Sequence, residues 1–207
     1  MGVGTEDKSR SELEKALALI NRASWSRSLT EAARCTELLD ALRILLDAYP
    51  RPLDGIPDDV QRALARRRKG RSTAKPKRAQ PEWVTHLIAQ QVIRDSLETT
   101  LDHPSSRLAV YGTLAPGESN HHVVASIPGR WEDGRVRGVV GKMGPYPAFH
   151  WKKPGGVVAV MVLHSAHLTN HWQRLDRFEG PGYRRILVPI ERAGDEVVVA
   201  NLYEGLG

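Results

Sequence analysis

The sequence has few of the features that mark secreted or membrane-spanning proteins. Of its 207 residues only Cys35 is a cysteine, so no disulfide can form within the chain. A chain that does without disulfides is typical of a reducing compartment, which predicts a cytoplasmic location. No apolar run is long enough for a transmembrane helix, and the polar first residues lack the apolar core of a secretory signal. We therefore expect no membrane association.

Acidic residues are missing from residues 62–78, a stretch that holds nine lysines and arginines. The whole chain has a formal charge of +6, and without these nine residues the charge would be −3. A basic run of this kind can contact nucleic acid or an anionic membrane surface. This run has no aromatic residues on which bases could stack, which favours a solvated linker at about residues 62–80 between two folded parts.

The first part of the chain, residues 1–104, is predicted to be helical. Apolar residues recur with helical spacing from about Ser11, over residues 30–49, after Pro57 and over residues 81–101. The buried side of the last helix is expected to consist of Trp83, Leu87, Ile88, Val92 and Leu97. A break at His103 and Pro104 then ends the helical region.

The second part, residues 105–207, changes to short β-type runs separated by glycine and proline. The runs are residues 108–111, 135–140, 157–163, 186–190 and 197–203. A short helix is expected at about residues 169–178. Irregularly spaced strands with one helix among them indicate an α+β domain rather than a repeated βαβ pattern.

A glycine turn follows the first of these strands, in the stretch RLAVYGTLAPGESNHH. Its spacing approaches the phosphate-binding pattern G-x-x-x-x-G-K-[ST], but Glu118 stands where the lysine should be. A glutamate would repel phosphate, so nucleotide binding is not expected. The turn at Gly112 is either an ordinary tight turn with a positive φ, or a set of exposed N–H groups that binds a carboxylate.

A second stretch, LDRFEGPGYRRILVPI, places Glu179 where a helix meets a glycine turn. An acid at a helix C-terminus is disfavoured by the helix dipole, and partial burial would disfavour its charge further. Both effects raise the pKa of a carboxyl group, which suits proton transfer. The alternative is a solvated surface acid. His164, His167 and His171 have a spacing that invites a metal site, but a strand end and a helix need not share a face.

Together these stretches resemble the gamma-glutamylcyclotransferase-like family, which contains the AIG2-like domain. The matching elements are Tyr-Gly-Thr-Leu at 111–114, Gly117 with Asn120, Tyr-Pro-Ala at 146–148, Leu-Asp-Arg-Phe-Glu-Gly at 175–180, and Tyr-Arg-Arg at 183–185. The resemblance covers residues 107–203 and leaves the helical part of the chain unmatched. It implies a small mixed β-barrel with flanking helices.

The resemblance also implies an enzyme that cyclises a γ-glutamyl group to 5-oxoproline and releases an amine, amino acid or peptide. Glu179 would be the catalytic acid and base. The implied substrate-binding residues are Tyr111, Gly112, Thr113, Leu114, Asn120, Tyr146, Pro147 and Tyr183. No metal or organic cofactor is implied, and the substrate is a small molecule.

A rival hypothesis gives the chain no catalytic role. In this alternative the protein is a binding or adaptor protein, and its helical, basic N-terminal half contacts nucleic acid through residues 62–78 or binds a protein partner. The γ-glutamyl compound used and the oligomeric state are not determined by the sequence.

Overall fold

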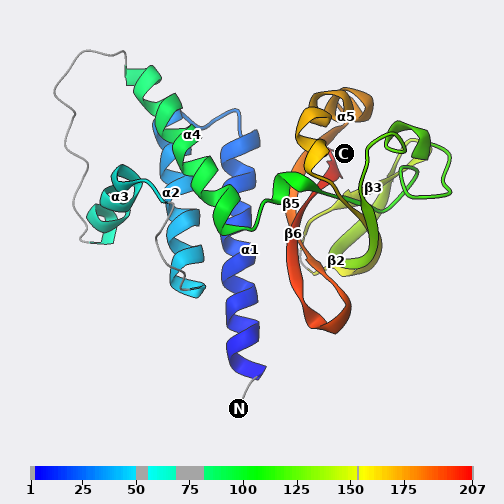
Figure 1. Ribbon diagram of the computed structural model, residues 1–207, viewed down its shortest axis with the longest axis horizontal. Helices are drawn as coiled ribbons and strands as arrows, with labels where there is room; N and C mark the ends of the chain where they lie inside the picture. Colours follow the sequence, from blue (N-terminus) through cyan, green and yellow to red (C-terminus); the bar gives the residue numbers. More distant parts are fainter. Residues whose placement is uncertain (1–2, 50–55, 69–81, 153, 207) are drawn as a thin grey trace. The chain divides into compact units, whose positions relative to one another are not determined.

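The computed structural model describes residues 3–49, 56–68, 82–152 and 154–206. The chain forms two compact units, Met1–Thr100 and Leu101–Gly207. In the described residues the first unit is helical and the second carries the strands (Figure 1). Most of the predicted basic linker falls in residues 69–81, which lie outside the described residues.

The N-terminal unit is built from long helices, as the apolar spacing predicts. They are α1 (Val3–Trp25), α2 (Glu31–Ala48), α3 (Asp58–Arg68) and α4 (Glu82–Thr100). Thr30 is the N-cap of α2, and its hydroxyl accepts a hydrogen bond of 3.2 Å from the Ala33 N–H. α2 packs against α1 and α4 around fully buried leucines such as Leu17, Leu38 and Leu42.

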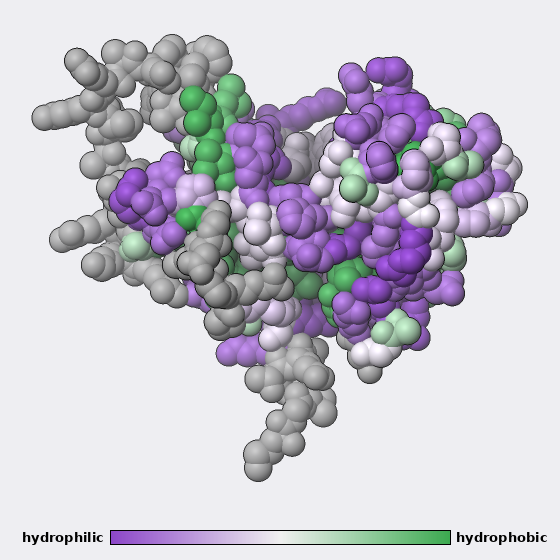
Figure 2. Space-filling view, viewed as in Figure 1, coloured by the Kyte–Doolittle hydropathy of each residue, from purple (hydrophilic) through white to green (hydrophobic). Residues whose placement is uncertain are grey.

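The predicted buried face of α4 is partly wrong. Leu97 is buried as expected, but Leu87 and Ile88 are about half exposed, and Figure 2 shows hydrophobic side chains on the outside of this helix. Gln90 takes a buried position instead, because its side-chain amide donates a hydrogen bond of 2.6 Å to the Glu31 carboxylate. In the described parts of the chain no helix is both long enough and apolar enough to cross a membrane.

The C-terminal unit is a closed barrel of mixed strand direction, as predicted. Its strands are β1 (Arg107–Val110), β2 (Arg130–Met143), β3 (Tyr146–His150), β4 (Gly156–His164), β5 (Tyr183–Glu191) and β6 (Val197–Gly205). The ring order is β2-β4-β1-β6-β5, and a pairing of Arg135 with Glu191 closes β5 onto β2. β1 and β6 run parallel, while the other pairs are antiparallel. β3 pairs with β2 as a hairpin outside the ring, and it was not among the expected strands.

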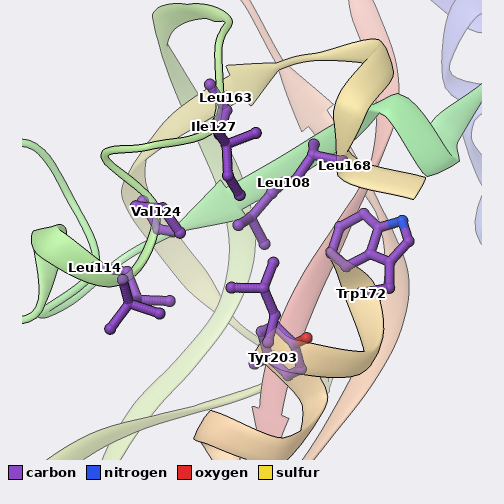
Figure 3. Packing of buried hydrophobic residues seen from close by; sticks show 11 residues of the cluster. Leu108, Leu114, Val124, Ile127, Leu163, Leu168, Trp172 and Tyr203 are labelled. Atoms are coloured by element: carbon purple, nitrogen blue, oxygen red, sulfur yellow. The ribbon is translucent and has the colours of Figure 1, made fainter. Parts of the chain in front are cut away.

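Two apolar clusters hold this unit together, because side chains along a strand alternate between its faces. One cluster fills the barrel and includes Phe149, which is fully buried. A Cβ at Gly138 would lie 2.3 Å from the Phe149 ring, so only glycine leaves room for it. The other cluster lies between β1 and the helix α5 (Trp172–Glu179), and Figure 3 shows Leu108, Trp172 and Tyr203 directed into it.

Candidate functional site

The C-terminal unit contains a cavity of about 310 Å³. Its walls come from the end of β1 and the turn after it, the β2–β3 hairpin, the end of α5, and strands β5 and β6. The lining residues are Ala109, Val110, Tyr111, Gly112, Thr113, Leu114, Asn120, Tyr146, Pro147, Phe178, Glu179, Tyr183 and Tyr203. The fold therefore brings together every site residue that the sequence analysis named, although they are spread over a large part of the unit.

The residues of the Gly112 turn line this cavity. Among the described residues, the N–H groups of Gly112, Thr113 and Leu114 donate no hydrogen bond to the protein. Gly112 does not have a positive φ, so the tight-turn explanation does not account for this glycine. A Cβ there would instead lie 3.1 Å from the Pro147 side chain, and the glycine allows the hairpin to come close.

Asn120 holds the turn from its far end. Its backbone N–H donates to the Thr113 carbonyl at 2.9 Å, and its side-chain amide donates to the Thr113 hydroxyl at 3.0 Å. The hydroxyl oxygen therefore accepts a hydrogen bond from Asn120, and its own proton is left for another acceptor. Asn120 thus orients Thr113 as a hydrogen-bond donor.

The tyrosines form the aromatic walls of the cavity. The Tyr111 hydroxyl donates to the Tyr203 carbonyl at 3.0 Å and accepts from the Phe149 N–H at 3.0 Å. Burial raises the pKa of Tyr111, so it stays protonated and serves as a fixed wall. The Tyr183 hydroxyl donates to the Pro147 carbonyl at 3.1 Å, which joins β5 to the hairpin.

Glu179 is the acid of the cavity. It is the last residue of α5, and Gly180 follows with a φ of 70° while its N–H donates to the Asp176 carbonyl at 3.1 Å. Burial raises the pKa of Glu179 from 4.5 to about 7. The described residues that line the cavity include no lysine, arginine or histidine, so no positive charge there lowers this pKa.

Four lining residues were missed by the sequence analysis: Ala109, Val110, Phe178 and Tyr203. Phe178 directly precedes Glu179 in the quoted motif, so the motif itself signalled it. Tyr203 had no such signal, because it comes from the last strand. Its hydroxyl donates to the Asp176 carboxylate at 2.7 Å, and Asp176 also lies within the motif at residues 175–180.

The histidine spacing does not produce a metal site in the described part of the chain. His164 ends β4, whereas His167 lies in a 3₁₀ turn and His171 precedes α5. No group of three histidine, cysteine or acidic side chains among the described residues is arranged to hold a metal ion. The loop after Gly112 likewise leads into a short 3₁₀ turn at His121–Val123, and not into the helix that a phosphate-binding loop requires.

The comparisons with known proteins concern this unit. The description of the family model that matches residues 108–205 is "Gamma-glutamyl cyclotransferase, AIG2-like". A comparison with curated protein sequences found no match.

Several solved structures are similar to parts of the chain. YkqA from Bacillus subtilis is 29% identical over 49% of this chain and 36% of its own length, with a TM-score of 0.41. An AIG2-like protein from Mus musculus is 22% identical over 49% of this chain and 77% of its own, with a TM-score of 0.39. Protein PH0828 from Pyrococcus horikoshii is 24% identical over 49% and 78%, with a TM-score of 0.37.

The match to YkqA thus spans about a third of that protein. The assignment of this chain rests on the family model and on the closed mixed barrel, which agree on the same residues. The C-terminal half of the chain, residues 108–205, is a domain of the gamma-glutamyl cyclotransferase, AIG2-like family.

Proposed function

We propose that the C-terminal unit is an enzyme that cyclises a γ-glutamyl group to 5-oxoproline and releases an amine, amino acid or peptide. One observation carries the proposal. Glu179, whose pKa burial raises to about 7, shares a cavity with the unpaired N–H groups of the turn at residues 112–114. An acid–base group and an anion-binding turn are the two parts that this reaction needs.

The reaction is intramolecular, so the protein mainly has to fold the substrate. The α-nitrogen of the γ-glutamyl group attacks its own γ-carbonyl carbon, a C–N bond forms, and a five-membered ring closes. The bond from that carbon to the leaving nitrogen then breaks. Holding the two reacting groups together supplies much of the rate enhancement in reactions of this kind. A cavity of about 310 Å³ is suited to a small molecule held in one folded shape.

Glu179 moves the proton. The α-ammonium group has to lose a proton before it can attack, and the Glu179 carboxylate accepts it. That proton passes to the leaving nitrogen. The regenerated carboxylate accepts the second proton, which the ring nitrogen loses as the lactam forms, and passes it to the released amine. A pKa of about 7 lets one group act as base and then as acid near neutral pH.

The turn stabilises negative charge. The N–H groups of Gly112, Thr113 and Leu114 bind the substrate α-carboxylate or the oxyanion that forms at the γ-carbonyl. The Thr113 hydroxyl adds a donor, because Asn120 occupies its oxygen. Tyr111, Tyr146 and Tyr183 enclose the carbon chain of the substrate. The proposed steps use only side chains and backbone groups of this unit.

The test is 5-oxoproline release from γ-glutamyl amino acids, γ-glutamyl peptides and γ-glutamyl amines. The full-length protein is compared with Glu179→Gln, which has nearly the same shape but does not titrate. We expect release above the enzyme-free background from at least one class, with a loss of at least about 100-fold in the variant. No release from any class by folded wild-type protein would reject the proposal.

A further inference from the structure

A cluster of polar and aromatic side chains joins α5 to the barrel and has no role in the chemistry above. Arg185 on β5 donates from Nε and Nη2 to the two oxygens of Asp176, at 2.9 and 3.2 Å. Its guanidinium carbon also lies 4.4 Å from the centre of the Trp172 ring. Asp176 follows Trp172 by four residues, so Arg185 contacts one face of α5 at two points a turn apart.

The cluster is fixed to two strands of the barrel. Nη1 of Arg185 donates to the Asn201 side chain at 3.3 Å, and Asn201 donates to the Pro104 carbonyl at 2.8 Å. The Tyr203 hydroxyl on β6 donates to Asp176 at 2.7 Å. Figure 3 shows Trp172 of α5 and Tyr203 of β6 directed into the same core. The orientation of α5 is therefore set by contacts that begin at β5 and β6.

α5 depends on these contacts because it is short. It spans eight residues, and a helix of about this length has little stability of its own in water. Glu179 is its last residue and follows Asp176 by three positions, so both belong to the final turn. A small rotation of α5 at Asp176 would move the Glu179 carboxyl group into or out of the cavity.

We propose that Arg185 is a positioning residue for Glu179, because its two contacts with α5 fix how deeply the last turn of that helix reaches into the cavity. The importance of this role for catalysis rests on the proposed function. The position of Glu179 itself is a property of the free protein, so it can be measured without a substrate.

The pKa of Glu179 reports how deeply its carboxyl group is buried in the cavity. Burial is what raises its pKa, so a shallower position would return the pKa toward the ordinary value of 4.5. The titratable groups that line the cavity from the other elements are Tyr111 after β1, Tyr146 on β3, Tyr183 on β5 and Tyr203 on β6. Burial is the main cause of the raised pKa of Tyr111, Tyr183 and Tyr203, and the negative charge of Glu179 raises each of them further.

The test is Arg185→Lys in the full-length protein. Lysine keeps the charge but loses the two parallel hydrogen bonds and the flat surface that stacks on Trp172. The measurement is an NMR titration of the Glu179 side-chain carboxyl carbon, assigned by its loss in Glu179→Gln. We expect the midpoint near pH 7 to fall by about one unit or more as Glu179 becomes more solvated. Where activity is present, kcat should fall about tenfold with a smaller change in KM.

Arg137→Lys is the matched control, because Arg137 makes a 3.4 Å contact with Glu191 on an exposed part of the barrel. This control should keep the wild-type midpoint. An unchanged midpoint in Arg185→Lys would overturn the proposal. If that variant does not fold, Trp172→Leu removes the stacking contact without changing charge, and it too must lower the midpoint. A wild-type protein that titrates as expected but releases no 5-oxoproline would reject the proposed function alone.

Discussion

Two glutamates of the same barrel unit have opposite environments. Glu132 on β2 accepts hydrogen bonds from Arg192 and, at 2.6 Å, from Arg130, and these contacts lower its pKa. Glu179 lies in a cavity whose described lining holds no positive charge, and burial raises its pKa to about 7. The same residue type is thus an anion in an ion pair at neutral pH at one place, and a group that titrates near neutral pH at the other. The neighbours decide which of the two it becomes.

The largest difference between the two glutamates should be in activity. Glu179→Gln removes the proposed proton acceptor, so we expect kcat/KM for 5-oxoproline release to fall about 10²- to 10⁴-fold. Glu132→Gln breaks an ion pair away from the cavity and should keep activity within about twofold of wild type. The measurement is kcat/KM for both folded variants on the best γ-glutamyl substrate. Equal losses of kcat/KM in the two variants would show that Glu179 has no catalytic role that Glu132 lacks.

A new carboxylate beside the turn that we propose binds an anion should be the next most damaging change. In Asn120→Asp the new side chain accepts the Thr113 proton instead of donating to its oxygen, and it brings negative charge toward the bound carboxylate. We expect KM to rise about 10- to 100-fold, because a charged hydrogen bond is lost. Steady-state kinetics give this value. The control is Glu118→Gln, an exposed change on the same loop. An unchanged KM in Asn120→Asp would show that the Thr113 hydroxyl does not take part in substrate binding.

The two glutamates should also change stability with pH in opposite directions. The folded pKa of Glu179 is raised, so its ionisation favours unfolding as the pH rises from about 4.5 to 7. Glu179→Gln should therefore raise the Tm at pH 8, by on the order of 5 °C, and much less at pH 4. Glu132 has a lowered pKa, so Glu132→Gln should lower the Tm at neutral pH, and the loss should shrink as the pH falls below 4.5. Thermal unfolding followed at several pH values measures both, and parallel curves for the two variants would contradict the assigned environments.

The smallest expected effect comes from the glycine that faces the hairpin. Gly112→Ala places a Cβ 3.1 Å from Pro147, so either the turn or the hairpin has to shift by a few tenths of an ångström. We expect KM to rise about two- to fivefold with little loss of folding, because the N–H groups move slightly. Gly156→Ala is the control, since nothing lies within 4 Å of the added atom. A wild-type KM in Gly112→Ala would show that the close approach of this turn to Pro147 is not critical for substrate binding.

Most of the lining of the cavity could be predicted because its residues lie in short motifs. The residues of the turn and of the α5 end were named from the sequence, and the fold gathers them around one cavity. What could not be predicted are contacts between separate elements. Asp176 meets Arg185 across 9 positions and Tyr203 across 27, and each comes from a different element. Nothing in local spacing indicates that these side chains meet.

The fold was predictable to a similar extent. Short β-type runs separated by glycine and proline located the barrel strands, but β3 was missed because Pro147 interrupts a run of only five residues. Apolar spacing also located α4, but it assigned Leu87 and Ile88 to the core. The partner of Gln90 is Glu31 on α2, and a polar residue can be buried when a distant side chain satisfies it.

The most direct test of the account is the pH dependence of kcat/KM for 5-oxoproline release by the wild-type protein. A carboxylate with a pKa of about 7 that must be ionised to accept a proton predicts a rate that rises with pH and levels off above that value. The same profile in Glu179→Gln should be flat and close to background. A wild-type rate that does not change between pH 5 and 8, or a variant that retains the wild-type profile, would contradict the role of Glu179.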